Sequence, residues 1–221
     1  RKDELHIYGP PPLRELIDQH LLHSQTVLRY PLHFHPTQDQ QRAVLLETEH
    51  LQVTSFPLDH RIPCTGFRFD EKPRLPSIDR AKAEAAGVPV AYFGRIKQGQ
   101  DYTAPDHTVH RWQDLTSPPA PPRSYAYCSD TIRTDLYLPY IQQVGLLYHE
   151  ATFLHEMLDR AEETYHTTAL QAGQIAAEAG ARKLLIGHYS ARYKDLKPLL
   201  EESRTAFSET ELALEGNWYI V

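Results

Sequence analysis

His60, Asp130 and His188 each come within two residues of the end of an apolar run of the kind that forms a buried strand. The three runs are residues 53–58, 125–128 and 184–187. In α/β sheets, ligands and metals gather at the carboxyl ends of the strands. Imidazole and carboxylate groups are ligands that a divalent metal accepts. Any one of these residues could simply end its strand, but three such strand ends together favour a metal site.

The spacing of apolar residues predicts the elements that would position these side chains. In the first half, strands are predicted at 5–8, 26–34, 43–48, 51–57 and 66–69. A helix with one buried stripe is predicted after the Gly-Pro-Pro-Pro turn at 9–12, because apolar side chains recur there at i, i+3 and i+4.

In the second half of the chain, predicted strands alternate with predicted helices. Strands are predicted at 124–128, 145–148, 184–187 and 211–214, and helices at 134–144, 154–163, 168–179 and 196–206. Thr168 and Gln171 form a capping box at the start of the third helix. A β-rich first half followed by an α/β second half predicts a layered α/β fold.

Composition narrows the class of protein. The chain has 221 residues, 23 Lys and Arg against 29 Asp and Glu, and 41% apolar residues, which is typical of a globular domain. No apolar stretch approaches the ~18 residues of a membrane span, so no membrane partner is expected. Two cysteines are too few for a disulfide framework, and we therefore expect a cytoplasmic location.

The region 70–111 contains several prolines and only weak apolar periodicity. This pattern predicts an insertion that lies outside the core of the domain. Eight Lys or Arg and four Asp or Glu lie between Arg61 and Lys97, although the whole chain has a net charge of −6. Basic side chains of this kind bind phosphates without reading sequence. A plain solvated insertion is the alternative. The candidate RNA-binding residues are Lys72, Arg74, Arg80, Lys82, Arg95 and Lys97.

Several segments resemble the ribonuclease Z family, the tRNA 3′-end endonucleases of the metallo-β-lactamase superfamily. They are Tyr-His-Glu-Ala-Thr-Phe at 148–153, Tyr-His-Thr-Thr-Ala at 165–169 and Gly-His-Tyr-Ser-Ala-Arg-Tyr at 187–193, with matches also at 58–63 and 129–131. The resemblance implies a four-layer αββα metallo-β-lactamase domain over residues 1–221, incomplete at its N-terminus. It also implies that 70–111 is an inserted tRNA-binding arm.

The resemblance also implies roles for individual residues. His60 and His188 would be ligands of two zinc ions, and Asp130 would bridge the ions. His166 would contact the scissile phosphate and help to protonate the leaving oxygen. Glu150 would orient a histidine, although it could be a plain surface carboxylate, and Arg192 would pair with phosphate.

One family motif is missing from the chain. The hallmark His-x-His-x-Asp-His would supply further histidine ligands and an aspartate base, whereas the His-x-His at His33 and His35 is followed by Pro-Thr-Gln. We therefore interpret His33 and His35 as strand histidines and expect the hallmark upstream of Arg1. The complete enzyme would hold two zinc ions per subunit. This chain would be depleted of zinc and inactive alone.

The leading hypothesis is a zinc-dependent endoribonuclease, a homodimer in the cytoplasm, that removes the 3′ trailer from precursor tRNA. One alternative is a zinc phosphodiesterase of the same superfamily that acts on other substrates. The other alternative is a non-catalytic RNA-binding or dimerisation partner, because the hallmark motif is absent from the 221 residues.

Overall fold

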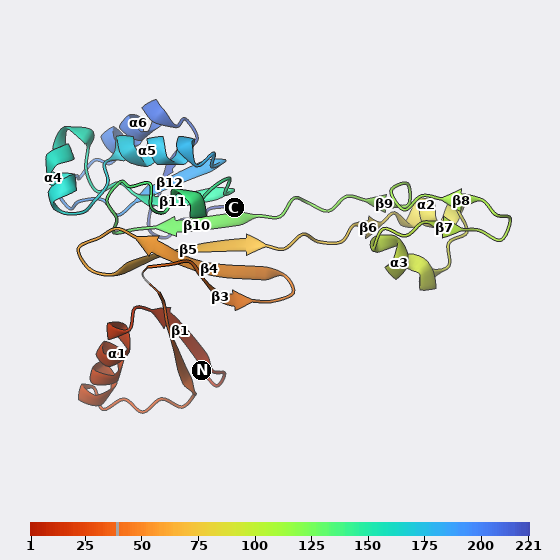
Figure 1. Ribbon diagram of the computed structural model, residues 1–221, viewed down its shortest axis with the longest axis horizontal. Coiled ribbons are helices and arrows are strands. Elements are labelled where there is room, and N and C mark those ends of the chain that lie inside the picture. The colour runs from red at the N-terminus through yellow and green to blue at the C-terminus, as the bar shows by residue number, and fades with distance from the viewer. Residues whose placement is uncertain (39) are drawn as a thin grey trace. The chain divides into compact units, whose positions relative to one another are not determined.

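The structure, a computed structural model, describes residues 1–38 and 40–221 (Figure 1). The chain divides into two compact units. One unit comprises Arg1–Asp70 together with Arg123–Val221, and the other comprises Glu71–Pro122. Among the described residues, no helix has the length and apolar character needed to cross a membrane.

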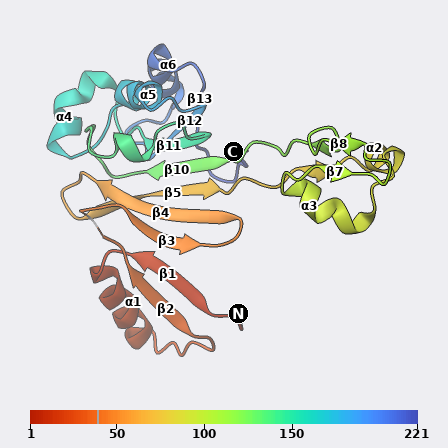
Figure 2. The same cartoon turned by 45° about the vertical axis from the view of Figure 1, so that its right-hand side comes forward.

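The first unit is built on a mixed seven-stranded sheet. Figures 1 and 2 show its strands from β12 to β3 side by side. Strands β10 to β13 run parallel to their neighbours, and β5 pairs with β10 in the antiparallel sense. In spatial order the strands are β13 (Thr210–Leu212), β12 (Lys183–Gly187), β11 (Leu146–Glu150), β10 (Ser124–Cys128), β5 (Cys64–Glu71), β4 (Leu51–Leu58) and β3 (Ala43–Glu47).

Helices α5 (Ala169–Glu178) and α6 (Lys197–Ala206) pack together beside this sheet. Their close approach depends on Gly173, because a Cβ placed there would lie 2.5 Å from the backbone oxygen of Ser203. The predicted capping box of Thr168 and Gln171 is present at the start of α5. A shorter helix, α4 (Leu158–Glu163), follows the 3-10 turn η3 (His155–Met157).

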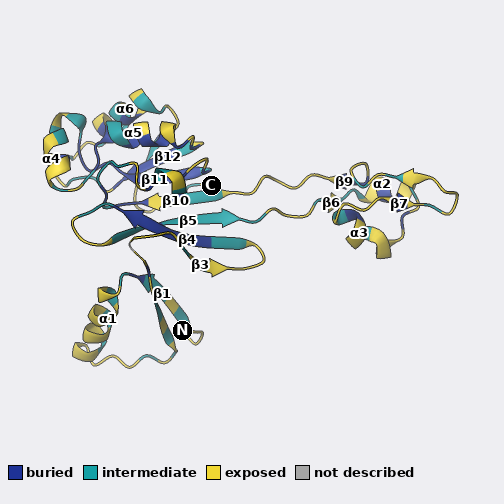
Figure 3. Ribbon diagram, in the orientation of Figure 1, coloured by how far each residue is buried: buried dark blue, intermediate teal, exposed yellow. Residues whose placement is uncertain are grey.

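The core of this unit lies between the sheet and the helices. Figure 3 shows most of β4 in the colour of buried residues. The largest fully buried side chains include Phe56, Tyr137, Leu147, Ile175 and Leu184. These residues come from strands, a loop and a helix, so the core fixes the loops that follow the strands.

A small parallel sheet of β1 (Leu5–Gly9) and β2 (Leu32–Pro36) accompanies α1 (Pro12–His23). The prediction of a buried stripe on α1 is wrong. No residue of the helix is fully buried, and Leu16 is 62% exposed. Apolar periodicity shows that a helix has an apolar face, but another element must cover that face to bury it.

Two other elements of the structure differ from those predicted from the sequence. The strand predicted at 26–34 begins only at Leu32, because residues 26–31 have no strand partner. The helix predicted at 134–144 is a single 3-10 turn, η2 (Leu138–Tyr140). The Thr134 hydroxyl accepts the Leu136 N–H at 3.3 Å, and Pro139 supplies no N–H, so a regular helix does not start.

The unit Glu71–Pro122 has its own small core, formed by Ala83, Val88, Ile96, Tyr102 and Leu115. Two short ladders pair β6 (Ser77–Ile78) with β9 (Thr116–Ser117) and β7 (Tyr102–Thr103) with β8 (Val109–His110). The helical segments are α2 (Arg80–Ala85), η1 (Val90–Tyr92) and α3 (Phe93–Lys97). We refer to Glu71–Pro122 below as the inserted unit.

Candidate active site

The polar residues singled out in the sequence follow neighbouring strands of the large sheet. Asp130 follows β10, Glu150 ends β11 and His188 follows β12. Because these three strands are parallel and adjacent, their carboxyl ends lie at one edge of the sheet. His60 reaches the same place from the end of β4, since the Asp59 carbonyl accepts the Ile132 N–H at 2.9 Å.

The backbone at this edge adopts an uncommon conformation. Asp130, Tyr165 and His188 have φ angles of 56°, 60° and 57°, in the left-handed region that residues other than glycine seldom occupy. Such conformations cost free energy and persist only where the surrounding structure enforces them. Asp130 and His188 turn the backbone just after β10 and β12, and Tyr165 turns it just after α4.

Three side chains present ligand atoms to one another. One atom each from Asp130, His166 and His188 all lie within 4.8 Å of one another. Nε2 of His188 is 3.2 Å from Oδ1 of Asp130. The His166 ring centroid is 5.2 Å from that of His188 and 5.3 Å from that of His60, so His60 borders this group of three and completes the cluster of four.

Hydrogen bonds from Nδ1 orient the rings of two histidines, His60 and His188. Nδ1 of His60 donates to the carbonyl oxygen of Tyr165 at 3.0 Å. Nδ1 of His188 donates to Oγ1 of Thr152 at 2.9 Å, because that hydroxyl in turn donates to Glu150. Each Nε2 is then left with its lone pair available, which is how proteins prepare a histidine to bind a metal.

Glu150 is completely buried and accepts four hydrogen bonds. The donors are the Thr131 N–H at 2.6 Å, the Thr152 hydroxyl at 2.5 Å, Nδ1 of His166 at 3.0 Å and the Thr167 N–H at 3.1 Å. Burial raises the pKa of the carboxyl, but the hydrogen bonds from His166 and Thr152 outweigh burial and the pKa is lowered. The hydrogen bonds therefore favour the ionised form of Glu150, which supports the cluster from below. The alternative that Glu150 is a plain surface carboxylate is wrong, because the residue is buried.

His166 lies immediately before the capped start of α5 and is 17% exposed. Its hydrogen bond to Glu150 raises the pKa of the imidazole; burial opposes this, and the charges of Glu150 and Asp130 reinforce it. The carboxylate thus stabilises the protonated form of the ring. With Nδ1 held by Glu150, Nε2 is the atom that can face a ligand.

Arg192 stands at the border of the same cluster. Its guanidinium lies 5.0 Å from the centre of the Phe153 ring, whose other neighbour is His166 with ring centroids 6.2 Å apart. Nε donates to the Ser190 hydroxyl at 3.2 Å. Among residues 1–38 and 40–221, no carboxylate forms an ion pair with Arg192. Its guanidinium is therefore available to bind an anion.

The donor set matches the chemistry of a divalent metal. Three imidazoles and one carboxylate meet at the sheet edge, and imidazole nitrogen with carboxylate oxygen is a ligand combination that zinc accepts. The hydrogen bonds to Tyr165 and Thr152 provide the outer support that metal-binding histidines normally have. The described residues therefore contain a possible metal site.

The sequence did not identify Thr152 and Tyr165 as site residues. Thr152 stands two positions after Glu150 in the His-Glu-Ala-Thr segment, which was a usable signal. Tyr165 acts through its backbone oxygen, which no side-chain pattern reveals. His33 and His35 lie outside the cluster, in β2, where His35 accepts or donates a hydrogen bond with His6 at 2.8 Å.

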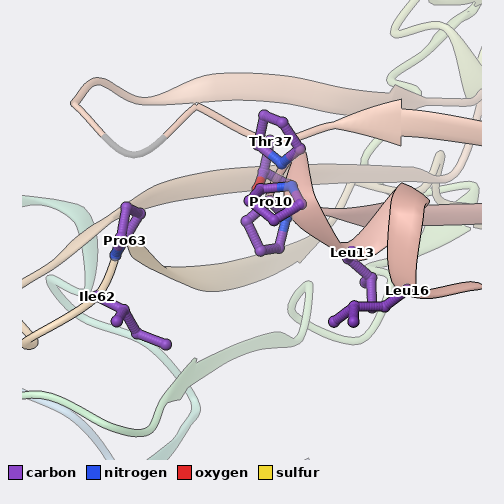
Figure 4. A pocket seen from close by; sticks show the side chains of 8 residues that line it. Pro10, Leu13, Leu16, Thr37, Ile62 and Pro63 are labelled. Atoms are coloured by element: carbon purple, nitrogen blue, oxygen red, sulfur yellow. The ribbon is translucent and has the colours of Figure 1, made fainter.

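An apolar pocket of about 590 Å³ occupies another part of the same unit (Figure 4). It is lined by the start of α1 and by a segment just after His60, and it contains no histidine or carboxylate. Its lining residues are Pro10, Pro11, Pro12, Leu13, Leu16, Thr37, Ile62 and Pro63. Figure 4 shows Leu13 and Leu16 projecting from the helix into this region.

Several of the candidate RNA-binding residues have partners inside the inserted unit. Arg74 pairs with Glu71 at 3.3 Å, Lys82 pairs with Asp79 at 3.7 Å, and the Arg95 guanidinium lies 5.3 Å from the centre of the Tyr92 ring. The whole inserted unit has seven Lys or Arg and six Asp or Glu. The inserted unit as a whole therefore has an excess of one positive charge.

Known proteins of similar sequence are ribonucleases. The chain is 42% identical over 222 residues to "Ribonuclease Z" of Cytophaga hutchinsonii, an alignment that covers all of this chain and 71% of that protein. It is 47% identical over 216 residues to "Ribonuclease Z" of Bacteroides fragilis, covering 98% of this chain and 71% of that protein. No family model matches the chain.

Solved structures of similar shape have the metallo-β-lactamase fold. Human tRNase Z, short form, aligns with a TM-score of 0.60 and 24% identity, covering 95% of this chain and 65% of that one. The metallo-β-lactamase fold protein YhfI from Bacillus subtilis also aligns with a TM-score of 0.60, at 20% identity, covering 98% and 65%. The α/β fold class expected from the sequence is confirmed.

Proposed function

Because the chain belongs to the ribonuclease Z family, whose members are phosphodiester hydrolases, we propose that it cuts precursor tRNA after the discriminator base and releases the 3′ trailer. One observation carries the proposal. His60, Asp130, His166 and His188 converge at one sheet edge over the buried Glu150, as hydrolysis of a phosphodiester with a bound metal requires.

Zinc is the metal that we propose for this site, with His60, Asp130 and His188 as its ligands from this chain. When bound, zinc ions acidify a water and stabilise the attacking and leaving oxygens of a phosphodiester. The contribution of the chain is orientation. The Tyr165 carbonyl holds Nδ1 of His60 and the Thr152 hydroxyl holds Nδ1 of His188, which leaves Nε2 of each ring free to bind the metal.

His166 would act on the substrate. Glu150 holds Nδ1 of His166, so the ring can present a proton from Nε2 to the oxygen that leaves. A positioned general acid of this kind typically contributes ~10²–10⁴-fold in rate. Arg192, whose guanidinium lies 5.0 Å from the centre of the Phe153 ring, would pair with a non-bridging phosphate oxygen.

The inserted unit would hold the body of the tRNA through Lys72, Arg74, Arg80, Lys82, Arg95 and Lys97. The basic side chains supply affinity for phosphates without sequence preference. We further propose that the protein is a cytoplasmic homodimer. The dimer is supported by the apolar pocket of Figure 4, where Leu16 of α1 is 62% exposed.

Depletion of the protein in its own cells tests the activity. Precursor tRNAs with intact 3′ trailers should accumulate, and the unchanged gene should restore mature 3′ ends. A gene carrying Asp130→Asn should not restore them, whereas one carrying Asp135→Asn, an exposed residue of the following loop, should. Normal 3′ ends after depletion would exclude the proposed function.

A further inference from the structure

The inserted unit contains a pocket that the roles given above do not use. It has a volume of about 270 Å³ and lies beside the paired strands β6 and β9. All of its lining residues belong to the inserted unit: Arg74, Pro76, Trp112, Gln113, Thr116, Pro118 and Pro119. The pocket therefore does not depend on any other part of the chain.

Trp112 is the aromatic wall of this pocket and is firmly anchored. Its backbone N–H donates to Oδ1 of Asp101 at 2.9 Å, and its carbonyl accepts the Thr116 hydroxyl at 2.9 Å. The side chain is half-buried, because it also packs against the core of the inserted unit. Such a ring offers a flat apolar surface that is already in place before any ligand arrives.

Three of the other lining residues are prolines. Pro76, Pro118 and Pro119 have fixed φ angles and no N–H groups to satisfy. A ligand that enters such a pocket orders little of the protein, so the entropic cost of binding is small.

Arg74 is the charged member of the set of lining residues, and none of that set is acidic. Its side chain is 66% exposed, and its pair with Glu71 at 3.3 Å is a solvent-exposed contact of the weak kind. The guanidinium can therefore exchange that carboxylate for a phosphate. An aromatic ring beside an arginine is a combination that binds a base and its phosphate.

We propose that this pocket takes one unpaired nucleobase of the precursor tRNA, which stacks on Trp112 while Arg74 pairs with the adjoining phosphate. The inference rests on the proposed function, in which the inserted unit holds the tRNA. It adds an uncharged contact to a surface that would otherwise act through charge alone. The stack gives the inserted unit a preference for a tRNA region in which a base is turned outward.

The test is binding of a 3′-extended precursor tRNA transcript to the 221-residue chain over a range of salt concentrations. Trp112→Leu keeps the apolar packing and removes the stacking surface, so affinity should fall about 5- to 150-fold. The slope of affinity against salt should stay unchanged, because no phosphate contact is lost. Trp218→Leu, which alters a residue 97% exposed in the C-terminal segment, should bind like the unchanged chain.

Fluorescence gives a second readout, since Trp112 and Trp218 are the two tryptophans of the chain. In the Trp218→Phe variant, emission comes from Trp112, and addition of the transcript should quench it. Trp112→Phe, which keeps an aromatic face, should bind far better than Trp112→Leu. Unchanged emission would overturn the proposal.

The outcomes also separate this pocket from the proposed function. If Trp112→Leu binds normally while Arg74→Ala, Arg80→Ala and Lys82→Ala together weaken binding, the pocket proposal fails and the tRNA-binding role stands. If Trp112→Leu reduces the salt slope as far as that triple variant does, the residue supports the fold, and the stacking proposal fails. If every variant binds normally, both proposals fail.

Discussion

Glu150 and His188 are joined through a single hydroxyl group. Oγ1 of Thr152 donates to Oε2 of Glu150 at 2.5 Å and accepts from Nδ1 of His188 at 2.9 Å. The same carboxylate accepts from Nδ1 of His166 at 3.0 Å. One buried charge therefore determines the orientation of two imidazoles that approach the cluster from different segments of the chain.

Glu150→Gln should affect both histidines at once. The amide cannot accept at both oxygen positions, so the bond from His166 or the bond from Thr152 is lost. Loss of a supporting residue of this kind typically costs ~10–100-fold in metal affinity or activity. Zinc titration and cleavage of precursor tRNA measure the two effects. Glu156→Gln, a change at the surface turn η3, is the matched control and should alter neither.

In the protein as its own cells make it, His188→Ala and His166→Ala should separate metal binding from chemistry. His188→Ala removes a proposed ligand, so zinc affinity and activity should fall together. His166→Ala should keep the zinc affinity of the unchanged chain and lower turnover by ~10²–10⁴-fold. Equilibrium dialysis against excess zinc, with single-turnover cleavage, distinguishes them. A loss of zinc in His166→Ala would show that His166 is a ligand. After exhaustive dialysis without zinc, we expect the unchanged 221-residue chain to hold less than one zinc.

The Glu150–His166 pair should make stability depend on pH in a defined window. The raised pKa of His166 gives stability that is complete below its ordinary value of 6.5 and is lost as pH rises through the folded-state pKa. The lowered pKa of Glu150 gives stability that is complete above 4.5 and is lost as pH falls through the folded-state pKa. The pair should therefore contribute most between pH 4.5 and 6.5.

Urea unfolding with a chelator present checks this window. The difference in free energy of unfolding between the unchanged chain and His166→Gln should be larger at pH 5.5 than at pH 8.5. A difference that grows with pH would contradict the assigned pairing. His23→Gln changes an exposed residue of α1 outside the pair. Its effect on the free energy of unfolding should be the same at pH 5.5 and pH 8.5.

Arg74→Ala, Arg80→Ala and Lys82→Ala together should weaken binding of precursor tRNA. The salt slope of affinity should fall by about one for each phosphate contact removed. Cleavage of a small phosphodiester, which the inserted unit does not hold, should barely change. Arg14→Ala with Lys197→Ala, in the other unit, is the charge control. Equal losses on both substrates would mean that the three residues support the active site instead.

Gly173→Ala should destabilise the protein, although alanine favours a helix by about 1 kcal/mol over glycine. The new methyl group would lie 2.5 Å from the Ser203 oxygen, and α5 would have to move away from α6. Overpacking of this kind costs about 1–3 kcal/mol. Thermal or urea unfolding measures the loss, and Gln174→Ala, at the exposed neighbouring position, should be neutral or stabilising.

Sequence pattern placed much of the framework of the site. Strand ends identified His60, Asp130 and His188, and the capping box located the start of α5, because these features depend on local spacing. The family resemblance added His166, Glu150 and Arg192. These roles remain predictions until the variants are measured.

Other features depend on contacts that local sequence does not encode. The Tyr165 carbonyl holds His60 from 105 residues away, and nothing near either residue indicates the partner. The left-handed backbone at Asp130 and His188 is imposed by the packed surroundings. The apolar periodicity of α1 is real, but periodicity does not report what covers a helix, so its burial was overestimated.

Asp70 and Ser124 are paired neighbours where β5 and β10 meet, so the chain leaves the sheet and re-enters it at adjacent positions. Asp130, in contrast, lies beyond the opposite end of β10. A gene can therefore lose, lengthen or exchange the codons for the inserted unit while every strand keeps its neighbour. In evolutionary terms, the inserted unit and the strand ends that carry the cluster are separable parts of one gene, and each can change in sequence without disturbing the other.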